Sequence, residues 1–75
     1  MLKILAANMT VLTVGDKAIL FSYETPVAVR FSDGSYEVTS TRFSRTTTKH
    51  INKWVGRYQH ASAVPQAVIE SYLKV

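Results

Sequence analysis

The sequence predicts an α+β fold, in which a small antiparallel β-sheet of two hairpins is followed by two short C-terminal helices. Two strand-like stretches, residues 10–23 and 26–39, are each interrupted by a short turn signal. After residue 44 the apolar residues recur with the period of a helix instead. The 75 residues contain no repeat and no low-complexity segment, so these elements are expected to form one domain, residues 1–75.

The first hairpin is predicted around the Gly-Asp pair at residues 15–16. Residues 10–14 and 17–23 are mostly β-branched or apolar, as is typical of strands. Glycine at the first central position favours a type II′ turn, because it adopts positive φ without a steric penalty. Counting outward from the turn places Leu12 opposite Ile19, and apolar residues on both sides predict that both faces of this hairpin are covered.

The second hairpin is predicted around the Asp-Gly pair at residues 33–34, a strong signal for a type I′ turn. Counting outward from this pair places Val29 opposite Val38 and Arg30 opposite Glu37. The register gives the strand pair one apolar face and a cross-strand ion pair on the other. Arg30 is therefore expected to have a structural role rather than a ligand-binding one.

Two amphipathic helices are predicted in the C-terminal part of the chain. The apolar stripe of the first consists of Ile51, Trp54, Val55 and Tyr58, and that of the second of Val68, Ile69, Tyr72 and Leu73. Ser44 or a following threonine can cap the first helix, and Gly56 predicts that this helix is short. Pro65 suits the first turn of the second helix. Both helices are expected to pack on one face of the sheet or across a subunit boundary.

The positive charge of the chain is concentrated in one segment. The net charge is +4, yet residues 39–68 contain no Asp or Glu and five basic residues. These are Arg42, Arg45, Lys49, Lys53 and Arg57. The rest of the chain has four basic and five acidic residues. A localised basic segment favours phosphate-bearing partners, and a merely solvated helix face is the alternative.

The basic residues of the first predicted helix form a stripe nearly opposite its apolar side. Lys49, Lys53 and Arg57 follow one another at four-residue intervals, with His50 and Trp54 at the boundary between the two sides. Like charges at this spacing repel one another slightly, and a face selected for solubility alone would normally mix signs. The uniform charge therefore favours a binding function.

An anion-binding site is predicted where this helix begins. Free backbone amides, the positive end of the helix dipole and several hydroxyl groups converge there. The predicted ligand-binding residues are Arg42, Arg45, Thr46, Thr47, Lys49, His50 and Lys53, with Tyr23 or Trp54 stacking on a base. Helix capping alone is the alternative role for the threonines.

The residue content argues against an enzyme and suggests neither a cofactor nor a metal site. The chain has no cysteine, no Gly-rich phosphate loop and no serine in a nucleophile-elbow context. His50 and His60 are its two histidines, with no carboxylate between them, so their spacing does not indicate metal ligands. His50 acting as a lone general base is the remaining catalytic alternative.

The small size of the chain predicts self-association. A chain of 75 residues buries only about 60% of its unfolded surface, and the absence of cysteine excludes a disulfide that would compensate. A homo-oligomer is therefore expected. The apolar run at residues 4–7 is too short for a signal peptide or a membrane span, so a cytoplasmic protein with no membrane association is expected.

Two motifs occupy the middle of the chain. The first is Tyr23, Thr25, Pro26, Val27 and Ala28; the second is Ser44, Thr46, Thr47, Lys49, His50 and Asn52, with Thr48 as an additional threonine. Together they resemble a family of short uncharacterised proteins encoded by bacteriophages and prophages. The resemblance covers residues 21–54. It implies a viral context, and hence the host cytoplasm, without implying a mechanism.

Four functions remain as hypotheses. The first is a non-enzymatic oligomer that binds a phosphate-bearing, nucleotide-like ligand at a subunit boundary and counters host defence by sequestering it. The second is binding of DNA or RNA, in which Lys53 and Arg57 would matter as much as Arg45. The third is inhibition of a host defence protein through exposed aromatic residues, Trp54 or Tyr58. The fourth is a structural component of a virion.

Overall fold

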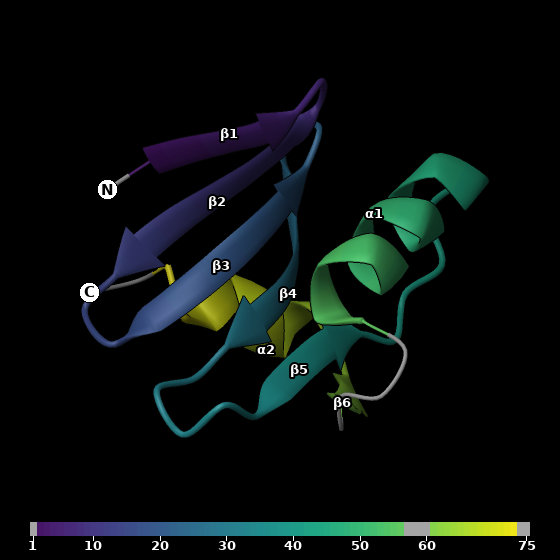
Figure 1. The fold of residues 1–75 in the computed structure, drawn as a ribbon. Coiled ribbons are helices and arrows are strands. Elements are labelled where there is room, and N and C mark those ends of the chain that lie inside the picture. Colours follow the sequence, from purple (N-terminus) through teal and green to yellow (C-terminus); the bar gives the residue numbers. More distant parts are fainter. Residues whose placement is uncertain (1, 57–60, 74–75) are drawn as a thin grey trace.

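The computed structural model describes residues 2–56 and 61–73. Within them lie six strands and two helices (Figure 1). In chain order these are β1 (Leu2–Ala6), β2 (Met9–Val14), β3 (Lys17–Ser22), β4 (Thr25–Arg30), β5 (Tyr36–Thr39), α1 (Arg45–Val55), β6 (Ala61–Val64) and α2 (Gln66–Ser71). The predicted α+β class is confirmed, and the sheet is larger than the two hairpins that the sequence predicts.

The six strands form one sheet in the same order as they occur in the chain. β1 to β5 are antiparallel neighbours, whereas β6 pairs parallel with β5. A parallel neighbour requires a crossover, and the crossover between β5 and β6 contains α1. The sequence pattern does not reveal the two outer strands, because β1 is a short apolar run and β6 consists of small residues with weak strand preference.

The register of the β2–β3 hairpin agrees with the prediction. Leu12 lies opposite Ile19, and Gly15 has a φ of 61° in the turn, which suits glycine. Ile19 and Leu20 are both fully buried although they point to opposite faces of the sheet. Both faces of β3 are therefore covered, as the apolar pattern indicates.

The predicted register of the β4–β5 hairpin is wrong by one residue. Arg30 lies opposite Tyr36 and Val29 opposite Glu37, so the expected Arg30–Glu37 pair does not form. The reason is the loop at residues 31–35, in which the Phe31 N–H donates to the Ser35 carbonyl and Asp33 Oδ1 accepts from both the N–H and the hydroxyl of Ser35. The carboxylate closes a wider turn than the Asp-Gly pair alone would make.

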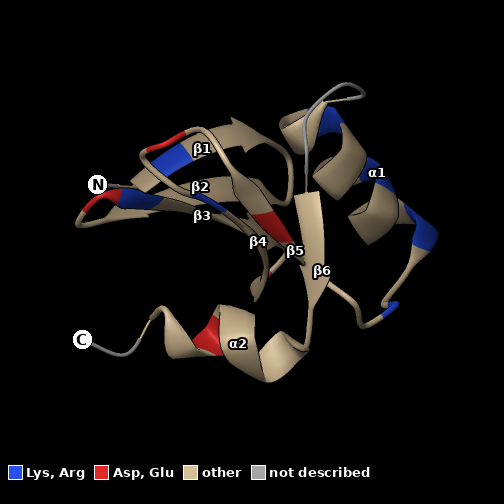
Figure 2. Cartoon of the chain, turned by 90° about the horizontal axis from the view of Figure 1, so that it is seen from below, with Lys and Arg blue, Asp and Glu red and all other residues tan. Residues whose placement is uncertain are grey.

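The two helices cover opposite faces of the sheet, whereas the sequence predicts both on one face or across a subunit boundary. Figures 1 and 2 show α1 and α2 on either side of the strands. α1 packs against β3 and β4, whereas α2 packs against β4 and β5. Because β3 and β4 carry apolar side chains on both faces, one covered face would leave the other exposed to water.

Each helix completes its own hydrophobic core. On the α1 side the buried residues are Met9, Val11, Ala18, Leu20, Val27 and Ala28, with Ile51 and Trp54 packed against them. On the α2 side they are Ile19, Val29 and Ile69, with Phe21, Phe31, Val64, Tyr72 and Leu73 packed around them. The predicted helix stripes are thus confirmed where they are described. Tyr58, predicted for the first stripe, lies outside the described residues.

Candidate functional site

The first turn of α1 is capped by Ser44, which has extended backbone angles just before the helix. Its Oγ accepts the N–H of Thr47 at 3.2 Å, and its carbonyl oxygen accepts the N–H and the hydroxyl of Thr48. Within the described part of the chain, the amides of Arg45 and Thr46 donate to no acceptor. Two orphan donors and the positive end of the helix dipole therefore face solvent at this point.

The inner side of α1 is tied to β3 by a buried polar network. Ser22 Oγ lies 3.0 Å from Thr47 Oγ1 and 2.8 Å from His50 Nδ1, and the Ser44 hydroxyl donates to Thr47 Oγ1 at 3.2 Å. A single direction of donation satisfies every group: Ser44 to Thr47, Thr47 to Ser22, and Ser22 to His50. The network fixes how α1 is rotated against the sheet, because Ser22 and Thr47 are both buried.

The outer side of α1 is uniformly basic. Arg42, Arg45, Lys49 and Lys53 are all exposed, and none forms an ion pair among residues 2–56 and 61–73. Figure 2 shows that the charged residues of α1 and of the loop before it are all basic, whereas the sheet and its turns carry charges of both signs and α2 carries an acidic residue. The predicted separation of a basic outer stripe from an apolar inner stripe is confirmed for the described residues of this helix, and Arg57, the third predicted member of the basic stripe, lies outside them.

Three of these cations line one small hollow. Arg42, Arg45, Thr48 and Lys49 surround a surface depression of about 220 Å³ where α1 begins. The hollow is smaller than the roughly 300–1,000 Å³ typical of sites that enclose a whole small molecule. It can accommodate an anionic group such as a phosphate, with the rest of a ligand lying outside it. Lys53 extends the charge one turn further along the helix, outside the hollow.

The threonines and the histidine of the predicted site divide between the two sides of α1. Thr46 is exposed beside the orphan amides. Thr47 is buried, and its amide and its hydroxyl are both used inside the network. His50 is half-buried with its Nδ1 bonded to Ser22. Thr48 is the threonine that lines the hollow. The sequence places its hydroxyl near the start of the helix but does not include it among the predicted ligand-binding residues, although its spacing of three residues from Arg45 puts the two on one side of the helix.

Trp54 belongs to the α1 core and not to an open stacking platform. Its ring is nearly perpendicular to that of Tyr36, with the centroids 5.5 Å apart, and the guanidinium of Arg30 lies 5.7 Å from the Trp54 centroid. A cation positioned over an indole face is held by the ring quadrupole. The shifted register of β4–β5 thus gives Arg30 an aromatic partner in place of the predicted carboxylate.

Tyr23 lies in the turn between β3 and β4 with a φ of 58°, a left-handed conformation that is uncommon for a tyrosine. Its N–H donates to the carbonyl of Asn8 at 2.7 Å, which holds the turn against the β1–β2 turn. The side chain is 49% exposed, and its ring lies 6.0 Å from the ring of His50. The fold therefore brings Tyr23 to His50, whereas the hollow is lined by other residues.

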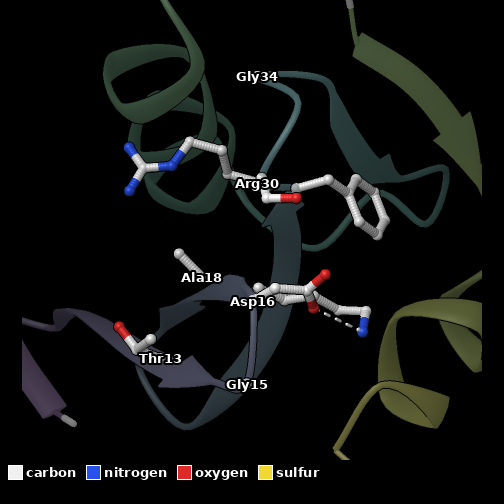
Figure 3. A pocket seen from close by; sticks show the side chains of 9 residues that line it. Thr13, Gly15, Asp16, Ala18, Arg30 and Gly34 are labelled. Carbon is white, nitrogen blue, oxygen red and sulfur yellow. Dashed lines mark hydrogen bonds and ion pairs between the residues drawn. The ribbon is translucent and has the colours of Figure 1, made fainter.

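A hollow of about 390 Å³ lies between the β2–β3 turn and the β4–β5 loop (Figure 3). Its charged residues are already engaged. Lys17 pairs with Asp16 at 3.4 Å and lies over the ring of Tyr72, and Figure 3 shows Arg30 reaching away from Asp16 toward α1. These contacts make the hollow a weaker candidate for anion binding than the one at the start of α1.

Comparison with known proteins identifies the family of the chain from its sequence. Residues 2–71 match a family of unknown function, DUF8033. The chain belongs to this family. No curated protein and no solved structure matches the chain. In the described part of this family member, neither helix is long and apolar enough to cross a membrane.

Proposed function

We propose that this protein is a non-enzymatic binder of a phosphate-bearing, nucleotide-like ligand. The observation that carries the proposal is the hollow at the start of α1, where Arg42, Arg45 and Lys49 converge without an acidic partner among the described residues. Cations brought together without counter-charges repel one another, and a bound anion relieves this repulsion. The orphan amides of Arg45 and Thr46 add donors of the kind that phosphate oxygens accept.

The proposed site takes a different set of residues from the one that the sequence suggests. Arg42, Arg45 and Lys49 hold the phosphate, and Thr48 lines the hollow while its hydroxyl donates to the Ser44 carbonyl. Thr47 and His50 act indirectly, since their side chains orient α1 through Ser22. This division separates residues whose loss should weaken binding from residues whose loss should weaken the fold.

The experiment is a titration with ATP and with inorganic phosphate, followed by calorimetry or by amide chemical shifts. The Arg45→Ala/Lys49→Ala variant should bind at least about tenfold more weakly, a loss of about 1.4 kcal/mol or more. Its melting temperature should stay within a few degrees of the wild type, because both side chains are exposed. Lys3→Ala/Lys17→Ala is the matched control, since it removes the same charge elsewhere and should leave binding unchanged. A large drop in melting temperature for the Arg45/Lys49 variant would show that the segment is structural.

A second candidate function is binding of DNA or RNA, favoured by the position of Lys53. The cations continue from the hollow along α1, whose 11 residues span about 16 Å and could meet successive phosphates. Binding to a polynucleotide should fall steeply as salt rises, and Lys53→Ala should reduce that salt dependence. Affinity for a short oligonucleotide that does not change with salt would count against this candidate.

The biological setting that we propose is viral. The resemblance of residues 21–54 to short phage and prophage proteins supports synthesis in the host cytoplasm. A small protein that holds a nucleotide signal without transforming it would act against host defence by sequestration. Retention of a nucleotide by the protein purified from cells, read by native mass spectrometry, is the measurement that tests this role.

A further inference from the structure

The outer strand β1 has an unusual surface for the edge of a sheet. Leu2 is 63% exposed, Ile4 is 74% exposed and Leu5 is 39% exposed. One side of this strand has no neighbouring strand among residues 2–56 and 61–73, so its outward N–H and C=O groups lack strand partners there. Proteins usually protect such an edge with charges, a proline or a β-bulge. β1 has one charge, on Lys3, and a register irregularity between Ile4 and Ala6, and its other exposed side chains are mainly apolar.

The apolar surface continues from β1 across the neighbouring strands. Leu2 lies opposite Leu12, and Ile4 lies opposite Thr10, which itself faces Phe21 on β3. Two adjoining hollows, of about 300 and 660 Å³, occur along this surface. Residues lining one or both include Leu2, Ile4, Thr10, Leu12, Phe21 and Tyr23. α2 packs mainly against β4 and β5, at the other end of the same face (Figure 2).

The opposite edge of the sheet gives a useful contrast. β6 has four residues, Ala61 to Val64, and its exposed side chains are alanine and serine. Pairing β1 of one copy with β6 of the next would be a head-to-tail contact, which leaves another edge free and extends without limit unless the copies close into a ring. Pairing β1 with β1 uses the same surface twice and closes after two copies.

We propose that β1 pairs antiparallel with β1 of a second copy of this chain, about a two-fold axis that passes beside Ile4. In this register Ile4 faces Ile4 of the second copy, Leu2 faces Ala6, and Lys3 faces Leu5. Like charges directly opposite one another would destabilise the pair, and this register keeps the two lysines apart. A register centred on Lys3 would instead place the two ammonium groups face to face.

The dimer would have a consequence for the basic helices. A two-fold axis perpendicular to the sheet reverses the strand direction and keeps each face on its own side. The two copies therefore form one continuous sheet, with both α1 helices on the same face and both α2 helices on the other. The dimer would present two basic stripes in the same direction to one polyanion or to two ligands. The dimer proposal does not depend on the proposed anion site, which can exist in either a monomer or a dimer.

The first test is the number of subunits, measured by native mass spectrometry and by light scattering at micromolar protein concentration. The wild type should contain two chains. Ile4→Lys should raise the dissociation constant of the dimer at least about tenfold, because it places two charges face to face at the axis. Phe43→Lys is the matched control, since Phe43 is a 46% exposed apolar residue before α1 and its replacement should leave the dimer intact. A monomeric wild type would overturn the proposal, and so would a dimer that Ile4→Lys leaves unchanged.

The second test uses disulfide crosslinking to measure the register in which the two β1 strands pair. The chain contains no cysteine, so an introduced one forms disulfides without competition. Facing residues of an antiparallel pair have Cβ atoms about 5 Å apart, close to the separation that a disulfide bridges. Ile4→Cys should therefore give a covalent dimer on mild oxidation, whereas Phe43→Cys should stay largely uncrosslinked. Equal crosslinking of the two variants, or none at Ile4→Cys, would contradict the pairing. A protein that stays monomeric and binds only foreign extended peptides at β1 would likewise refute it.

Discussion

α1 and α2 cover opposite faces of one sheet by different means. α1 has 11 residues, a serine cap and a buried polar network that bonds it to β3. α2 has six residues, begins after Pro65 without a side-chain cap, and buries Ile69 completely. The charged residues on the outward side of α1 are all basic, whereas α2 carries Glu70 as its charged residue.

This difference indicates where function and stability lie. The attachment of α1 uses internal serine, threonine and histidine groups, which leaves its exposed cations free for a ligand. The attachment of α2 depends mainly on apolar contact, with hydrogen bonds from Gln66 to the Pro26 carbonyl at its start and from Tyr72 to Glu37 at its end. We therefore expect substitutions on α2 to affect mainly stability, and substitutions on the outer side of α1 to affect mainly binding.

The largest expected effect is on the α2 side. Ile69→Ala should lower the free energy of unfolding by about 3 kcal/mol, because it removes a fully buried side chain and leaves a cavity. Ile51→Ala is the same change on α1, where the residue is only half-buried. It should lower the free energy of unfolding by about half as much as Ile69→Ala does. Urea denaturation measures both. An equal or larger loss at Ile51 would mean that the two helices do not differ in this way.

A smaller effect is expected in the polar network on the α1 side. Ser22→Ala should lower the free energy of unfolding by about 2 kcal/mol, because Thr47 and His50 both lose a buried partner. Ser62→Ala, on the exposed side chain of β6, serves as the control and should change it by less than about 0.5 kcal/mol. Loss of protection from hydrogen exchange should be concentrated in α1. If both serine variants behave alike, the network does not anchor the helix.

The smallest effect is expected at the end of α2, and it depends on pH. The Tyr72 hydroxyl donates to Glu37 Oε1 at 2.5 Å, and this bond, followed by burial, raises the pKa of Tyr72 above 10. The folded state therefore retains the phenolic proton more tightly than the unfolded state. The resulting stability is fully present below pH 10 and is lost as the pH rises through the pKa of the folded state.

Tyr72→Phe should accordingly lower the free energy of unfolding by about 1 kcal/mol at neutral pH. It should also remove part of the decline in stability between about pH 9 and pH 11. Tyr23→Phe is the control, because the Tyr23 hydroxyl forms no hydrogen bond within the described residues. A decline at high pH that is identical in the wild type and in Tyr72→Phe would exclude this contribution.

Local patterns predict much of the fold. The β2–β3 register follows from a glycine that requires positive φ, and α1 follows from a 3.6-residue apolar period bounded by Ser44 and Gly56. The basic stripe follows from the same period. β1 and β6 escape prediction because an edge strand is defined by its neighbour more than by its own residues.

Some features of the candidate site can be predicted from the sequence, and others depend on the fold. Arg42, Arg45 and Lys49 are recognisable as a group from their spacing, and the fold gathers them around one hollow. The burial of Thr47 cannot be read from the sequence, because it depends on Ser22, which lies 25 residues earlier in the chain. The position of Trp54 depends in turn on Arg30 and on the register of another hairpin.

The sequence without a structure establishes the α+β class, the amphipathic helices and the concentration of positive charge in one segment. These properties depend on residues close together in the chain, whose spacing has direct geometric meaning. The tertiary structure alone decides which face each helix covers, the register of β4–β5 and the exposure of β1 at an edge. These depend on contacts that the chain spacing does not specify, such as the bonds between Phe31, Asp33 and Ser35 in the loop where the β4–β5 register departs from the predicted one by one residue.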